Sequence, residues 1–136
     1  MKFYIASRRK NHVQVKILAS QLKQRGWVHT YDWTEDGSVK AIDIDTLKSI
    51  GQKEADGVRE ADILVVLTPQ GGGTHVELGM AIALNKAVYI CHADDTYFRC
   101  DDNTSTFYWL PNVCRFTGST EALAQKLQAD YAAGRG

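Results

Sequence analysis

Five apolar residues, Ile63–Leu67, followed by glycines at 71–73 and then by a helical apolar pattern, constrain the fold most strongly. A buried strand that passes through a glycine-rich loop into a helix is typical of a parallel sheet covered by helices. In such sheets, ligands bind at the loops that leave the carboxyl ends of the strands. Glycines allow the backbone to approach a ligand, and a helix N-terminus supplies free N–H groups. The stretch therefore predicts both an α/β fold and a ligand site.

Glu77 falls in the first turn of the predicted helix that follows this loop. The positive end of the helix dipole there favours an ionised carboxylate. An ionised, positioned carboxylate is suited to nucleophilic attack on a sugar carbon. The same residues also fit a capping box, with Thr74 at the N-cap and Glu77 three residues later. The two roles are compatible, and the pattern alone leaves both open.

The alternation of short apolar runs with helical patterns continues along the chain. It predicts a single domain over residues 1–136, a flavodoxin-like or Rossmann-like three-layer α/β sandwich. We expect a five-stranded parallel sheet in the order 2-1-3-4-5. Strands are predicted over 2–6, 27–31, 62–68, 87–91 and 112–116, and helices over 11–25, 43–60, 74–85 and 119–133, with Asn11 as the first N-cap, a break near Gly51, and loops over 32–41 and 92–110.

Composition excludes several classes of partner. Lys and Arg number 16, as do Asp and Glu, so we expect no binding to nucleic acid polymers or to anionic membranes through net charge. No apolar run approaches the roughly 20 residues that span a bilayer. The three cysteines and the acidic residues at 94, 95, 101 and 102 have no metal-site spacing, so we expect no metal and no cofactor. With no signal-peptide pattern, a reducing cytoplasm is the expected location.

The predicted topology brings four loops to one rim: residues 7–10, 32–33, 71–77 and 92–95. Ser7 with Arg8 or Arg9 suits a 5′-phosphate, although a solvated basic turn fits equally well. Asp32 and Trp33 fit turn chemistry with a packing aromatic, or a ring that stacks on a base. Tyr4 alternates with Phe3 and Ile5 and fits core packing.

Four segments, residues 3–7, 31–34, 61–67 and 73–81, resemble the nucleoside 2-deoxyribosyltransferase-like superfamily, which includes the 2-deoxynucleoside monophosphate N-glycosidases. The resemblance implies that Glu77 attacks C1′ of the sugar and that Tyr4 orients it. It also implies an acid that protonates the leaving base, matched by Glu54 with Asp56 as its rival. Implied substrate contacts are Ala6, Ser7, Arg8, Asp32, Trp33, Asp56, Gly71, Gly72, Gly73 and Thr74.

One departure from the family pattern favours hydrolysis. The transferases carry an Asp six residues before the nucleophile, where this chain has Gly71. The expected function is therefore an N-glycosidase acting on a (2′-deoxy)nucleoside 5′-monophosphate. Alternatives are a deoxyribosyltransferase that exchanges nucleobases, cleavage of a dinucleotide such as NAD, and a non-catalytic nucleotide sensor. The family implies a homodimer or higher homo-oligomer, and aromatic residues at 107–109 are expected to cover the crevice or a subunit interface.

Overall fold

The computed structural model describes residues 1–36 and 43–132, which form one parallel sheet in the strand order β2-β1-β3-β4-β5. This confirms the predicted α/β class and strand order. The strands are β1 Lys2–Ser7, β2 Val28–His29, β3 Ile63–Leu67, β4 Ala87–His92 and β5 Val113–Thr117. The helices are α1 His12–Gln24, α2 Ile44–Glu60, α3 Gly72–Ala83 and α4 Thr120–Ala132, with short 3-10 turns η1 Arg9–Asn11, η2 Trp33–Asp36 and η3 Thr106–Trp109.

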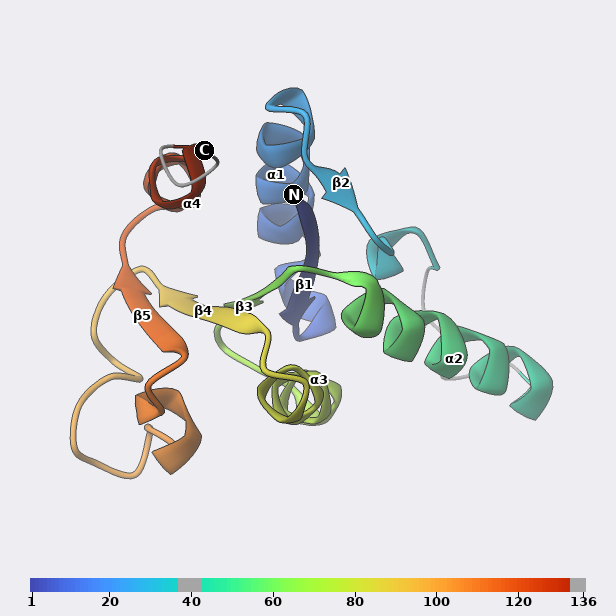
Figure 1. Ribbon diagram of the computed structural model, residues 1–136. Helices are drawn as coiled ribbons and strands as arrows, with labels where there is room; N and C mark the ends of the chain where they lie inside the picture. Colours follow the sequence, from blue (N-terminus) through green and yellow to red (C-terminus); the bar gives the residue numbers. More distant parts are fainter. Residues whose placement is uncertain (37–42, 133–136) are drawn as a thin grey trace.

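Helices cover both faces of the sheet. Figure 1 shows α1 and α4 on one side and α2 and α3 on the other. Because both faces are covered, the central strands read as continuous apolar runs, and every residue of β3 is buried. Phe3 and Ile5 alternate with Tyr4 along β1, so Tyr4 faces the opposite helical layer from its neighbours.

Three predicted features differ from the structure. The second strand is limited to Val28–His29 at the sheet edge, where it pairs with only two residues of β1. The predicted break near Gly51 is wrong, because α2 runs through this position without interruption. One glycine in a helix costs about 1 kcal/mol relative to alanine, which the rest of a long helix easily offsets. Within the predicted loop 32–41, residues 33–36 form η2, whereas residues 37–42 and the predicted helix end at 133 lie outside the described residues.

The parallel register brings the carboxyl ends of the central strands to one edge of the sheet. Ser7 at the end of β1 is in register with Leu67 at the end of β3, and Leu67 with Cys91 in β4. The loops that follow β1 and β3 therefore begin side by side. Among residues 1–36 and 43–132, no helix is long and apolar enough to cross a membrane.

Candidate active site

The centre of the site is a buried pair formed by Glu77 on α3 and Tyr4 on β1. The Tyr4 hydroxyl donates a hydrogen bond to Oε2 of Glu77. The Tyr4 side chain is fully buried, and Glu77 is only 8% exposed. In the described part of the chain, no cation forms an ion pair with Glu77. The carboxyl group is thus buried, and its hydrogen-bond donor is a neutral group, the Tyr4 hydroxyl.

The predicted capping box is wrong, because α3 begins earlier than expected. Gly71 is the N-cap, and Gly72 and Gly73 form the first turn instead of a loop. Thr74 is therefore the third helical residue, and its buried hydroxyl accepts a hydrogen bond from the backbone N–H of Gly71 at 3.0 Å. This moves Glu77 into the second turn, where it caps nothing and faces Tyr4.

The expectation that the helix dipole ionises Glu77 is also wrong. Burial raises the pKa of Glu77 to about 8, and the charge of Glu54 contributes in the same direction. The hydrogen bond from Tyr4 lowers the pKa but does not offset the loss of hydration. The dipole falls off within the first turn, which Glu77 has left. The carboxyl group is consequently poised to titrate just above neutral pH.

Tyr4 remains a hydrogen-bond donor at any ordinary pH. Burial raises the pKa of its hydroxyl strongly, and the neighbouring charges of Glu77 and Glu54 raise it further. An un-ionised phenol beside a carboxyl group orients one oxygen and stabilises the ionised form of its partner. Tyr4 can therefore both pack in the core, as the alternation predicted, and orient Glu77, as the resemblance implied.

Glu54 is the acidic residue of α2 that acts on this pair. It is half-buried, and burial, followed by the charge of Asp36, raises its pKa, whereas Arg9 lowers it. Asp56 lies two residues further along α2, about 200° around the helix. Its exposed carboxylate accepts hydrogen bonds from Arg59 and Gln52 at 2.9 Å. The structure thus brings Glu54 to the site and leaves Asp56 on the outer face.

A network of side chains joins the loops that follow β1 and β3. Ser7 Oγ donates to the carbonyl of Leu67 at 2.6 Å and accepts from Nδ2 of Asn11 at 2.8 Å. The Asn11 amide also donates to the carbonyl of Pro69 at 2.9 Å. Asn11 occupies the N-cap position of α1, as predicted, but its side chain caps no helix N–H. Its amide instead fixes the two loops to one another.

Arg8 and Gly71 bring the same loops into contact at the rim. A Cβ at Gly71 would lie 3.5 Å from Cβ of Arg8. The guanidinium-bearing side chains of Arg8 and Arg9 are exposed, whereas Ala6 is buried in β1. Since the Ser7 hydroxyl already donates to Leu67, it has no proton left for a phosphate oxygen. The arginines are the remaining candidate anion donors here.

Trp33 and Asp32 are engaged within the protein. Trp33 is 6% exposed, and its indole N–H donates to the carbonyl of Ile5 at 2.7 Å. The guanidinium carbon of Arg9 lies 5.8 Å from the centre of the Trp33 ring. Asp32 accepts a hydrogen bond from the backbone N–H of Thr34 at 3.0 Å, which is turn chemistry. Trp33 thus supports Arg9 near Glu54, an arrangement that the sequence pattern did not reveal.

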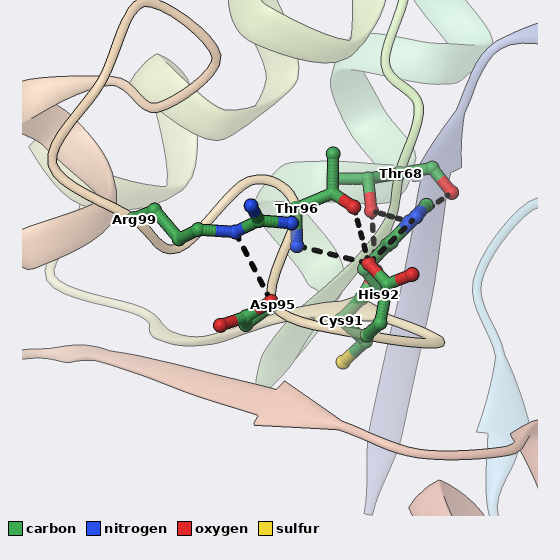
Figure 2. A network of polar contacts seen from close by, with 7 residues as sticks. Thr68, Cys91, His92, Asp95, Thr96 and Arg99 are labelled. Carbon is green, nitrogen blue, oxygen red and sulfur yellow. Dashed lines mark hydrogen bonds and ion pairs between the residues drawn. The ribbon is translucent and has the colours of Figure 1, made fainter.

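The loop after β4 faces a different cavity. Thr68 and His92 point toward one another in Figure 2, with Thr68 Oγ1 2.6 Å from Nδ1 of His92. Both residues line a cavity of about 240 Å³ together with Gln14 of α1 and Leu123 of α4. That cavity lies on the α1 and α4 side of the sheet, away from Glu77. Asn11 and Leu67 also line this cavity, so residues at the carboxyl ends of β1, β3 and β4 meet at this edge of the sheet.

The acidic residues of this loop bond locally. Asp95 pairs with Arg99 at 3.1 Å in Figure 2, and Asp94 accepts from the backbone N–H of Thr96 at 2.9 Å. The described residues contain no group of three or more His, Cys, Asp or Glu that could hold a metal ion.

The aromatic run divides between the core and the surface. Tyr108 is buried, and its hydroxyl lies 3.1 Å from Nε2 of His75 on α3. Phe107 and Trp109 are 58% and 49% exposed. Phe107 lines a shallow apolar pocket with the α3 residues Leu78 and Ile82. Only one of the three rings is therefore buried within the monomer.

Comparisons with known proteins agree with this architecture. A family model described as nucleoside 2-deoxyribosyltransferase matches residues 3–127. A CMP N-glycosidase from Clostridium botulinum is similar in structure, with a TM-score of 0.62 and 19% identity, covering 94% of this chain and 99% of that one. A conserved protein from Enterococcus faecalis V583 has a TM-score of 0.63 and 18% identity, covering 96% and 98%. The search of curated proteins found no match.

Proposed function

Because the chain belongs to the nucleoside 2-deoxyribosyltransferase family, we propose that it is an N-glycosidase of a (2′-deoxy)nucleoside 5′-monophosphate. The observation that carries this proposal is the buried Glu77–Tyr4 pair, with Glu54 beside it. Glu77 has neither a capping role nor an ion-pair partner among the described residues. A buried carboxyl group of this kind lowers stability, and such groups gather at functional sites.

The proposed reaction uses the two carboxyl groups in turn. An oxygen of ionised Glu77 bonds to C1′ while the bond from C1′ to the base nitrogen breaks, and the base leaves with a proton from Glu54. Water then bonds to C1′, the bond to Glu77 breaks, and the released proton passes to Glu54. Both carboxyl groups return to their starting states, as in retaining glycoside hydrolysis.

The surroundings of the pair support these roles. Tyr4 holds one Glu77 oxygen, which directs the other toward the substrate. Burial and Asp36 favour protonated Glu54, the form that a general acid needs. The exposed Arg8 and Arg9 at the adjoining loop suit a 5′-phosphate, since guanidinium groups bind phosphate in a bidentate manner.

Hydrolysis is preferred to base exchange because of the residue at position 71. The transferases resembled by the sequence carry an Asp there, whereas Gly71 supplies only backbone to the helix start. The name of the CMP N-glycosidase that shares the fold supports the same preference and places CMP in the substrate panel. Base exchange remains the second candidate, and a nucleotide sensor the third.

The decisive test compares wild type with Glu77→Gln on nucleosides, 5′-monophosphates and NAD. Free base is measured by chromatography, with and without a second base, and melting curves are recorded in parallel. We expect wild type to release base from a monophosphate without an acceptor, and Glu77→Gln to release none while remaining folded. Base release only with an acceptor would assign the transferase. A monophosphate that raises the melting temperature without any release would assign the sensor.

We also propose a homo-oligomer. Large apolar side chains are exposed at Val76 on α3, at Phe107, which lines a pocket beside α3, and at Trp109, whose ring lies against Arg115. Such surface is typical of protein contacts. Light scattering should give at least twice the monomer mass of 15.2 kDa, and Trp109→Ser should reduce it.

A further inference from the structure

Gly57 lies at a tight contact between α2 and two tyrosines. A Cβ at this position would lie 2.9 Å from Cδ2 and 3.0 Å from Cε2 of Tyr4, and 3.0 Å from Cβ of Tyr31. Carbon atoms that are not bonded to one another do not approach this closely, so any larger residue requires a tyrosine or the helix to move. Gly57 lies within α2 and so has ordinary helical backbone angles. Glycine is therefore favoured here by the lack of space for a side chain and not by an unusual backbone angle.

A hydrogen bond fixes α2 at the same point. The hydroxyl of Thr30 donates to the carbonyl of Gly57 at 2.7 Å. This carbonyl belongs to the last four of the helix, which have no partner within it. Thr30 follows β2 directly, and its own N–H donates to the carbonyl of Phe3 at 3.0 Å. The end of α2 is therefore held against the sheet edge through Thr30.

This contact stands behind the Glu77–Tyr4 pair. The Tyr4 ring touches Gly57, and its hydroxyl donates to Glu77. Tyr4 is fully buried, so a displaced ring carries its hydroxyl with it. Glu54 precedes Gly57 by three residues and shares its face of α2. The approach of α2 at Gly57 thus sets the position of both Tyr4 and Glu54.

We propose that Gly57 is a positioning residue of the site: its missing side chain lets α2 close onto Tyr4, which holds the Tyr4 hydroxyl against Glu77 and Glu54 beside them. The kinetic consequence rests on the proposed function, but the geometry does not. The role of Gly57 is therefore tested by one measurement without substrate, the Tyr4 hydroxyl resonance, and by one with substrate, the rate of base release.

The first experiment compares Gly57→Ala with Gly51→Ala, a control on the same helix where an added Cβ meets nothing within 4 Å. The substrate-free readout is the hydroxyl proton resonance of Tyr4 in the NMR spectrum, identified by its loss in Tyr4→Phe. We expect it to shift or broaden in Gly57→Ala and to stay unchanged in Gly51→Ala. This readout stands even if no substrate releases base.

The kinetic readout uses a double-mutant cycle. Gly57→Ala should lower kcat by roughly tenfold to a hundredfold, because a displacement of about 1 Å has effects of this size, and leave KM within about threefold. In the Tyr4→Phe background the ring persists but the hydroxyl is gone, so Gly57→Ala should lower kcat clearly less than it does in wild type, the remaining loss coming from Glu54. Equal losses in both backgrounds would mean that Gly57 does not act through Tyr4, and would overturn the inference.

Thr30→Val adds no bulk, so it tests the same contact even if the Gly57→Ala protein fails to fold. Thr30→Val removes the hydrogen bond to Gly57, and Thr30→Ser keeps it. We expect Thr30→Val to shift the Tyr4 resonance in the same direction and Thr30→Ser to restore it. An unchanged resonance in Thr30→Val, or in a folded Gly57→Ala protein, overturns the proposal.

Discussion

Replacing Glu77 by Gln should stabilise the protein, by an amount that depends on pH. In the unfolded chain the carboxyl group ionises near its ordinary pKa of 4.5, whereas in the folded protein it ionises near 8. Between these values the unfolded state releases a proton that the folded state retains, so the free energy of unfolding falls as pH rises. Gln has nearly the same volume, is neutral at every pH, and still accepts the Tyr4 hydrogen bond.

The size of the effect follows from the two pKa values. Each unit of pH between them removes about 1.4 kcal/mol of stability. At pH 7 the wild type should therefore be less stable than Glu77→Gln by about 3 kcal/mol, and at pH 9 by about 5 kcal/mol. Near pH 4.5 the difference should nearly vanish. For a domain of this size, the change at pH 7 corresponds to about 10 °C in Tm.

Urea denaturation at pH 5, 7 and 9 tests this prediction. Glu60→Gln, which changes an exposed glutamate at the end of α2, is the matched control for a general effect of losing one carboxylate. We expect the Glu77→Gln and wild-type stabilities to diverge with pH, and those of Glu60→Gln and wild type to run parallel. A Glu77→Gln protein that is less stable than wild type at every pH would refute the reasoning and restore a structural role for the carboxylate.

Three further predictions concern the site. Base release, measured as kcat/KM on the unliganded enzyme, should pass through a maximum as pH rises, because Glu77, with a pKa of about 8, must ionise to attack while Glu54 must keep its proton; a flat profile from pH 6 to 9 would contradict this. In the same assay, Glu54→Gln should lower kcat by roughly 10²- to 10⁴-fold and Asp56→Asn by less than about twofold, since only Glu54 faces the site. Asn11→Ala should lower the free energy of unfolding by about 1–3 kcal/mol in urea titrations, because it leaves the Pro69 carbonyl without its side-chain donor; a neutral Asn11→Ala would show that the loops hold together without it.

The sheet was predictable because its signal is local and repeated. Buried parallel strands require apolar runs, and Ile63–Leu67 is such a run. The two-residue β2 was overestimated because β propensity continues past His29, whereas the pairing with β1 ends at Phe3. Gly51 was read as a breaker because composition does not reveal how much the rest of α2 contributes to its stability.

The site was predictable only in part. Glu77 was indicated by the strand–loop–helix pattern and by the resemblance, the role of Tyr4 by the resemblance alone, and the structure joins the two by a hydrogen bond. The pattern Thr-x-x-Glu placed the N-cap three residues too late, because Gly72 and Gly73 form the first turn and the Thr74 hydroxyl, in the third position, accepts from the N–H of the N-cap Gly71. The sequence could not separate Glu54 from Asp56 because both fit the implied acid; the face that α2 turns to the sheet is set by tertiary packing.

That face is determined in part at Gly57, where sequence gives no signal at all. A glycine three residues before the end of a helix usually counts only as a weak helix former. Here it admits the Tyr4 ring and accepts the Thr30 hydroxyl through its carbonyl, so this contact helps to hold α2 at its distance and rotation. Rotation brings Glu54 inward and leaves Asp56 in solvent. The absence of a Cβ at position 57 therefore helps to determine that Glu54, and not Asp56, faces the site.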